Sequence, residues 1–259
     1  MLRIVTLAAG VALLSSAVSG GEFVPLFDGK SLDGWIQRGG KAKYEVVDGT
    51  IVGTAVPNTP NSFLCTPKSY GDFVLELEVN NDIGLNSGIM IRAQVRDEQY
   101  HASGTKADGK PWKRKVAAGR VHGYQVEVDH NPQRSYSGGI YDEARRGWLY
   151  NLSADEKKPA REAYRFGKWN HYRIECRGDS IKTWVNGVAA AELVDDWDAA
   201  GFFGLQVHSI NKPQEEGLQV RWRNLKIKQL AATKPGSDAK ASSASKPGSA
   251  SKPGSAAKP

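Results

Sequence analysis

The sequence predicts an all-β protein, built as a two-sheet antiparallel sandwich of the jelly-roll type. Three observations support this prediction. The chain is rich in short runs of alternating apolar and polar residues, tight-turn signals separate these runs, and long helical periodicity is absent. Because each such strand buries one face, a chain with many of them packs best as two facing sheets.

The alternating runs follow one another through most of the chain. In one of them Phe73, Leu75, Leu77 and Val79 share a face, and in a later one Tyr124, Val126 and Val128 do so. The strands expected on this basis, in chain order, lie within residues 46–53, 73–79, 87–94, 124–128, 169–192, 202–208 and 218–227.

Two dipeptides predict hairpin turns. Asp48-Gly49 and Asn186-Gly187 combine residues that tolerate positive φ, which two-residue hairpin loops require. By contrast, residues 96–120 contain Gly, Lys, Asp and Pro and little apolar content, so we expect a long surface loop there.

Both ends of the chain differ in composition from the body. Arg3, the apolar run 4–14 and the small residues that follow are typical of a secretory signal peptide, which we place at residues 1–19. Residues 231–259 repeat Lys-Pro-Gly-Ser and hold no apolar side chain larger than alanine, so we expect a disordered tail. The β-sandwich domain is therefore expected at 20–230, in a protein that is secreted or resides in the periplasm or cell envelope.

The charge of the chain lies mostly at its ends. Of the formal net charge of +7, the tail contributes +4 and the leader +1, which leaves about +2 for the body. This distribution gives no support to a nucleic-acid surface. No segment matches the ~18 apolar residues of a membrane-spanning helix. The lysines of the tail suit either contact with an anionic cell-envelope polymer or a solubilising spacer.

Cys65 and Cys176 lie in strand-like runs. In an oxidising compartment they could form one disulfide, and as buried free thiols they would be equally ordinary. Cys176 shares its parity with Tyr172 and Ile174, which indicates that it faces the core.

Polar side chains of unusual type occupy the outward positions of several expected strands. Arg, Gln, His and Trp are frequent there, although Lys, Glu and Thr would satisfy a solvated face. If several of these strands share a sheet, one face offers hydrogen-bonding groups and an indole to a sugar. The outward candidates used below are Arg92, Gln125, Glu127, Asp129, Trp184, Gln206, His208 and Arg223.

Several short motifs, in order along the chain, make the sequence recognisable. They include Phe27-Asp28-Gly29, Tyr70-Gly71-Asp72-Phe73, Asn86-Ser87-Gly88-Ile89, Gly123-Tyr124-Gln125-Val126-Glu127, Trp184-Val185-Asn186-Gly187 and Trp222-Arg223-Asn224. On these motifs, which span residues 23–229, the chain resembles the 3-keto-disaccharide hydrolase family. Many members carry Glu-x-Gln where this chain reads Gln125-Val126-Glu127.

The resemblance implies a concanavalin A-like sandwich that acts on glycosides oxidised at C3. A ketone at C3 acidifies the C2 proton, so a base can remove it and the C1 substituent can leave by elimination, before water adds back. We expect His208 to be the base, with Glu127 as the alternative base or the acid, and Arg92 to stabilise the enolate.

The remaining candidates are expected to bind the substrate, which we predict to be a small carbohydrate. They are Gln125, Asp129, Tyr141, Trp184, Gln206 and Arg223. No cofactor is certain, and a divalent metal could replace an arginine as the electrophile, although no ligand spacing demands one.

Two other functions remain open. A glycosidase that uses two carboxylates could employ Glu127 and Asp129, which lie about 6.6 to 6.8 Å apart along one strand face. A non-catalytic carbohydrate-binding module could use the same face, with Trp184 and Tyr141 as stacking platforms and residues 135–141 as a binding loop.

Overall fold

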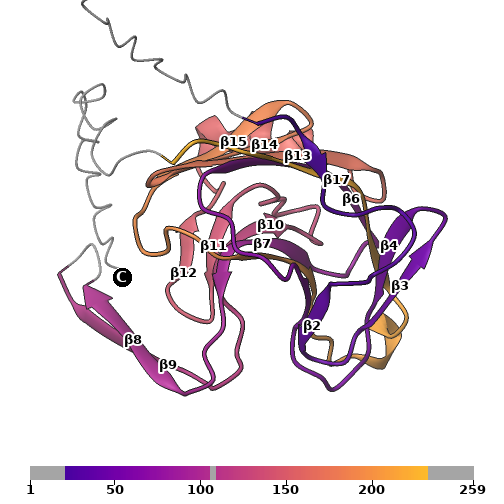
Figure 1. The fold of residues 1–259 in the computed structure, drawn as a ribbon, viewed down its shortest axis with the longest axis horizontal. Coiled ribbons are helices and arrows are strands. Elements are labelled where there is room, and N and C mark those ends of the chain that lie inside the picture. Colours follow the sequence, from indigo (N-terminus) through magenta and orange to yellow (C-terminus); the bar gives the residue numbers. More distant parts are fainter. Residues whose placement is uncertain (1–20, 106–108, 233–259) are drawn as a thin grey trace, which may run out of the picture.

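The computed structural model describes residues 21–105 and 109–232. The expected signal peptide and almost all of the expected tail lie outside these residues. Nearly every described element is a strand, as predicted. The strands form an eight-stranded antiparallel sheet, a seven-stranded antiparallel sheet and a separate two-stranded hairpin, and Figure 1 shows the two large sheets lying one over the other.

The eight-stranded sheet, called sheet A below, has the order β15-β14-β13-β6-β17-β4-β3, with β1 paired to β17. Its strands are β1 (Val24–Pro25), β3 (Lys43–Val47), β4 (Thr50–Thr54), β6 (Phe73–Asn81), β13 (Asn170–Arg177), β14 (Ser180–Val185), β15 (Val188–Val194) and β17 (Gln219–Gln229).

The seven-stranded sheet, called sheet B, has the order β12-β11-β10-β7-β16-β5-β2. Its strands are β2 (Ile36–Gly39), β5 (Ser62–Cys65), β7 (Ser87–Gln94), β10 (His122–Val128), β11 (Ile140–Glu143), β12 (Gly147–Tyr150) and β16 (Phe202–Val207). The other elements are the hairpin of β8 (Tyr100–Thr105) and β9 (Pro111–Val116), the helix α1 (Lys158–Ala163) and the 3-10 turns η1 (Asp155–Lys157) and η2 (Pro213–Glu215).

The core lies between the two sheets. Sheet A contributes Leu75, Leu77 and Ile174, and sheet B contributes Ile89 and Val126, to one cluster of buried side chains. These residues occupy one parity of their strands, so the opposite parity of sheet B faces away from the core. That outer face carries the site described below.

Both predicted hairpin turns are present. Asp48 and Gly49 have φ of 47° and 72°, and Asn186 and Gly187 have φ of 49° and 83°. Positive φ at both central positions matches the twist of the flanking strands. Residues 96–120, however, are not a plain loop: β8 and β9 pair within them and project from the sandwich (Figure 1). Their pairing uses residues with little apolar content, which hid it from a search for hydrophobic alternation.

The two cysteines are free and buried. Cys65 lies on β5 of sheet B and Cys176 on β13 of sheet A, where it faces the core as its parity predicted.

Candidate functional site

A pocket of about 470 Å³ opens on the outer face of sheet B. Residues of β10 and β16 form its floor, and β7 lies between these two strands in the sheet. Five residues expected at the site line it: Gln125, Glu127, Tyr141, Gln206 and His208. Other polar and aromatic side chains that were not expected at the site also line it, namely Asn86, His130, Arg134, Glu143, Trp148, Lys212 and Glu215.

Glu127 lies at the floor of the pocket and is only 4% exposed. Its Oε1 accepts hydrogen bonds from Asn86 at 2.7 Å and from Arg134 at 3.3 Å, and its Oε2 accepts one from Gln125 at 3.3 Å. Burial raises the pKa of Glu127 to about 7, and the charge of Asp129 acts in the same direction, against these hydrogen bonds and Arg134. A carboxyl with this pKa can give or take a proton near neutral pH.

His208 follows the end of β16 and is half-buried. Its Nδ1 lies 2.8 Å from the carbonyl oxygen of Ser209. A carbonyl oxygen can only accept a hydrogen bond, so Nδ1 carries the proton and Nε2 of the neutral imidazole holds the lone pair. The ring is therefore held in the tautomer that a base needs.

Asp129 holds part of the wall and does not line the pocket. It is fully buried just beyond the end of β10, and its two oxygens each lie 2.8 Å from a nitrogen of Arg134. Backbone N–H groups of Asn131 and Tyr136 also donate to it. These bonds place Arg134 beside Glu127.

Two aromatic side chains, Trp148 and Tyr141, line one side of the pocket and form its aromatic wall, with Tyr136 packed behind Trp148. The ring of Trp148 lies edge-on to Tyr141 and Tyr136, at centroid distances of 5.4 and 5.5 Å. The guanidinium of Arg134 lies 5.9 Å from the Trp148 ring centroid. Aromatic rings of this kind pack against the apolar face of a sugar ring.

Arg92 does not reach the pocket, contrary to expectation. Its φ of 46° breaks the alternation of β7, so parity counted from Met90 no longer holds there. The guanidinium is instead 1% exposed and donates to Asp72 at 3.0 Å and to the carbonyl oxygens of Gly71 and Gly178. Arg92 therefore joins segments of the two sheets, and its guanidinium is engaged by these three acceptors.

Arg223 and Trp184 lie on the other sheet. They belong to β17 and β14 of sheet A, where Arg223 pairs with Glu78 and stacks over Trp169, and Trp184 stacks with Arg173. The sequence gives the parity of a strand but not the sheet that it joins, which is why both were grouped with the pocket.

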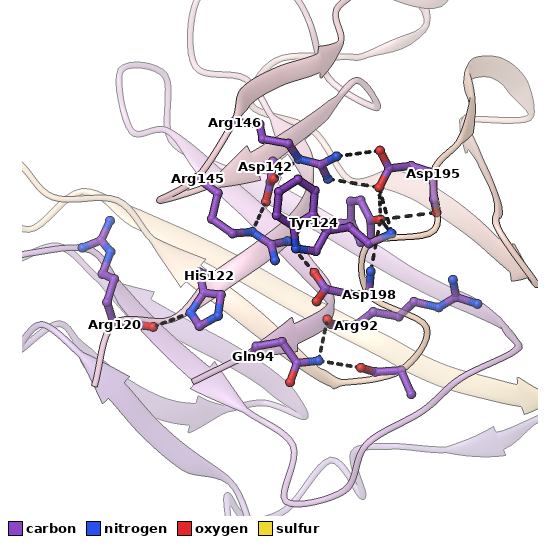
Figure 2. Close-up of polar contacts among 12 residues, drawn as sticks. Arg92, Gln94, Arg120, His122, Tyr124, Asp142, Arg145, Arg146, Asp195 and Asp198 are labelled. Carbon is purple, nitrogen blue, oxygen red and sulfur yellow. Dashed lines mark hydrogen bonds and ion pairs between the residues drawn. The ribbon is translucent and has the colours of Figure 1, made fainter. Parts of the chain in front are cut away.

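A second group of charged side chains lies outside the pocket (Figure 2). Arg145 pairs with Asp142 and Asp198, while Arg146 pairs with Asp142 and Asp195. Asp142 lies on β11 between Tyr141 and Glu143, which line the pocket. The group therefore fixes β11 against the segment that joins β15 to β16.

No group of three or more His, Cys, Asp or Glu side chains is arranged to hold a metal ion within residues 21–105 and 109–232. In the same part of the chain, no helix is long and apolar enough to cross a membrane.

Comparison with known families shows to which family the chain belongs. The family described as the 3-keto-alpha-glucoside-1,2-lyase-like domain matches residues 22–228. The chain belongs to this family. The resemblance found in the motifs is thereby confirmed, and the chain is a carbohydrate-active domain of the 3-keto-glucoside lyase-like type.

Solved structures agree with the fold of this lyase-like domain. A candidate glycosyl hydrolase from Parabacteroides distasonis has a TM-score of 0.50 and 18% identity, covering 82% of this chain and 94% of its own. A galectin-like protein of unknown function from Bacillus subtilis has a TM-score of 0.52 and 10% identity, covering 83% of this chain and 99% of its own. No curated protein matches the sequence.

Proposed function

We propose that this protein cleaves 3-keto-glycosides by removing the C2 proton and expelling the C1 substituent. The observation that carries the proposal is Glu127, a buried carboxyl with a pKa of about 7, in one pocket with a histidine held in its basic tautomer. An acid and a base in a sugar-sized pocket are what this elimination requires. The family description, a 3-keto-alpha-glucoside-1,2-lyase-like domain, supports the choice of an elimination on a 3-keto-glucoside.

In the proposed reaction, Nε2 of His208 takes the proton from C2, and the electron pair of the C2–H bond forms an enolate with the C3 oxygen. The enolate then re-forms C3=O, its C2=C3 electron pair forms a C1=C2 double bond, and the glycosidic C1–O bond breaks. Protonated Glu127 gives its proton to the departing oxygen. Subsequent addition of water across C1=C2 would complete a net hydrolysis.

The stabilising groups differ from those expected from the sequence. Arg92, expected to stabilise the enolate, and Arg223, expected to bind the substrate, are engaged elsewhere, and we assign the C3 oxygen to the amides of the floor, Gln125 and Gln206. Preorganised donors directed at a developing oxyanion are an effective way of lowering such a barrier.

Product analysis tests the proposal. The protein is incubated with 3-keto-glycosides of α and β configuration, with and without a chelator, and the released alcohol and sugar are identified by NMR. Release of the alcohol with an unsaturated or hydrated 3-keto sugar is the expected result. No turnover of any 3-keto-glycoside would contradict the proposal.

A non-catalytic carbohydrate-binding module is the second candidate, and the aromatic wall of Trp148 and Tyr141 favours it. The two functions separate at His208, because a binding module needs no base. If His208→Ala abolishes product release while sugar binding persists, the pocket is catalytic.

The predicted signal peptide adds a second proposal, that the reaction takes place outside the cytoplasm. Cell fractionation of the native host tests it, and recovery of the protein with its leader in the cytosol would contradict it.

A further inference from the structure

Two glutamines cross the floor of the pocket and end at Glu127. Nε2 of Gln206 donates to Oε1 of Gln125 at 2.8 Å, and Nε2 of Gln125 donates to Oε2 of Glu127 at 3.3 Å. These two hydrogen bonds link the three side chains into a series, called the amide chain below, which runs from β16 to β10 over the intervening strand β7. All three side chains are at least 96% buried.

Gly88 of β7 makes this crossing possible. It is the residue directly opposite both Gln206 and Glu127 in the sheet. A Cβ atom at this position would lie 2.4 Å from Cδ of Gln125, so any larger residue would displace the amide. The floor is therefore shaped to hold the amide chain.

At the Gln206 end of the amide chain, one oxygen lacks a hydrogen-bond partner. Oε1 of Gln206 is buried and accepts no hydrogen bond within the described residues, although Gln206 lines the pocket. An unsatisfied buried acceptor is costly, and a ligand group that fills it removes that cost.

The hydrogen bonds of the amide chain can all run in either of two directions. With Glu127 ionised, each amide N–H points toward the carboxylate, and Gln206 presents its oxygen to the ligand. With Glu127 protonated, its O–H donates to Gln125, both amides turn by half a rotation, and Gln206 presents its N–H group instead. Mixed arrangements oppose oxygen to oxygen or N–H to N–H, so protonation and direction change together.

Different ligand groups favour different directions of the amide chain, because Gln206 offers an acceptor in one direction and a donor in the other. A hydroxyl group both donates and accepts, and therefore suits either direction, whereas a carbonyl oxygen only accepts and suits the reversed one. We propose that Gln206 is the residue that distinguishes a carbonyl oxygen from a hydroxyl on the sugar, and that a carbonyl bound to Gln206 holds Glu127 protonated through Gln125. This inference rests on the proposed function, since it makes the C3 ketone the group that Gln206 binds.

The coupling serves both ends of the reaction. Nε2 of Gln206 becomes a donor to the C3 oxygen, where charge develops in the enolate. Glu127 keeps its proton, held against Oε1 of Gln125, until the departing oxygen takes it. An unoxidised sugar gives no such bias and leaves Glu127 free to ionise.

Other charged and titratable groups face Glu127 and set its background. Asp129, His130 and Arg134 come from the end of β10 and the loop after it, and Tyr141 and Glu143 come from β11. His208, Lys212 and Glu215 line the pocket from the segment that follows β16. Tyr172 of β13 contacts Glu127 from sheet A, where its hydroxyl donates to the Glu127 carbonyl oxygen. Their charges act on Glu127 whichever sugar is bound, so a comparison of two matched ligands cancels them.

The test uses a ketone that has no glycosidic leaving group, 1,5-anhydroglucitol oxidised at C3, and its parent polyol. Calorimetric titrations at pH 8 in two buffers of different ionisation enthalpy give the number of protons taken up on binding. We expect the ketone to take up close to one proton and the polyol close to none. The affinity for the ketone then falls by up to about tenfold per pH unit above pH 7.

Two variants interrupt the hydrogen bonds of the amide chain and leave Glu127 in place. Gln125→Leu deletes the central amide and Gly88→Ala displaces it, so both are expected to bind the ketone without differential proton uptake. Gln219→Leu, a matched change on sheet A, is expected to keep the wild-type value. Circular dichroism and thermal melts establish that each variant is folded.

The outcomes separate this inference from the proposed function. Equal proton uptake for the two ligands, or uptake that survives Gln125→Leu, overturns the amide chain even if the enzyme turns over 3-keto-glycosides. Differential uptake without turnover of any 3-keto-glycoside supports the chain and contradicts the proposed reaction. Failure to bind either ligand contradicts both.

Discussion

Asn86 donates a hydrogen bond of 2.7 Å to Oε1 of Glu127. The donor stands just before β7, and the acceptor is buried on β10. The bond favours the ionised carboxylate and so opposes burial, which disfavours it. The pKa of about 7 results from this opposition, and it places the acid of the proposed reaction in the range where it can work.

The first prediction concerns Asn86→Ala. Loss of its hydrogen bond raises the pKa of Glu127, so the alkaline limb of the rate profile moves to higher pH. A hydrogen bond to a charged group contributes about 1.5 kcal/mol, which corresponds to roughly one pH unit. Profiles of kcat/KM between pH 5 and 10 measure the shift. Asn151→Ala, on the surface, should leave the limb in place, and an unmoved limb in Asn86→Ala would contradict the assignment.

The second prediction concerns Glu127→Gln. Without the acid, the rate on a 3-keto-glycoside with an alkyl leaving group should fall by about 10²- to 10⁴-fold. A nitrophenyl leaving group needs little protonation, so much of its rate should remain. The exposed Glu192→Gln serves as the control. Equal losses on both substrates would show that Glu127 is not the acid.

The third prediction concerns His208→Ala. Removal of the base should abolish exchange of the C2 proton of a bound 3-keto sugar with D₂O, as followed by NMR. The sugar should still bind, because the floor amides and the aromatic wall remain. His171→Ala, on sheet A, should exchange at the wild-type rate. Persistent exchange in His208→Ala would transfer the role of base to another residue.

The fourth prediction concerns Arg92→Ala. Because Arg92 and Asp72 form a buried pair, removing the cation should lower the free energy of unfolding by about 3–5 kcal/mol. Arg223→Ala removes a far more exposed partner, about 40% of whose side chain is accessible, and should cost less than about 1 kcal/mol. Denaturant titrations measure both. A fully stable Arg92→Ala with impaired turnover would restore Arg92 to the site.

The fifth prediction concerns Trp148→Ala. Loss of the aromatic wall should raise KM by about tenfold, since a ring contact contributes about 0.5–1.5 kcal/mol beyond the area that it buries. The value of kcat should change little, because the acid and the base remain in place. Trp184→Ala on sheet A is the matched control. A change in kcat alone would contradict a binding role for Trp148.

Local pattern predicted much of the fold. Alternation at Phe73–Val79 and the Asn186-Gly187 turn depend on neighbours in sequence, and the structure reproduces both. The same parity rule predicted outward positions for Gln125, Glu127, Gln206 and His208. The structure brings them together in one pocket, because β10 and β16 flank β7 in sheet B.

The features that the sequence did not predict depend on contacts between residues far apart along the chain. Nothing in the alternation of residues 218–227 shows that β17 joins β4 and β6, so Arg223 was assigned to the wrong sheet. The bulge at Arg92 changes parity within one strand, and it is visible only in the structure, as a positive φ and as register shifts against β10 and β16. Trp148 and Arg134 lie in a short strand and a loop, where no periodicity marks them.

The most direct test of the proposed elimination is the fate of the C2 hydrogen. A 3-keto-glycoside is turned over in D₂O for a time short enough that the uncatalysed control shows no exchange, and the 3-keto sugar product is examined by NMR and mass spectrometry. Elimination followed by hydration predicts one solvent deuterium at C2. A product that keeps its original hydrogen at C2 would mean direct hydrolysis, and would contradict the roles assigned to His208 and Glu127.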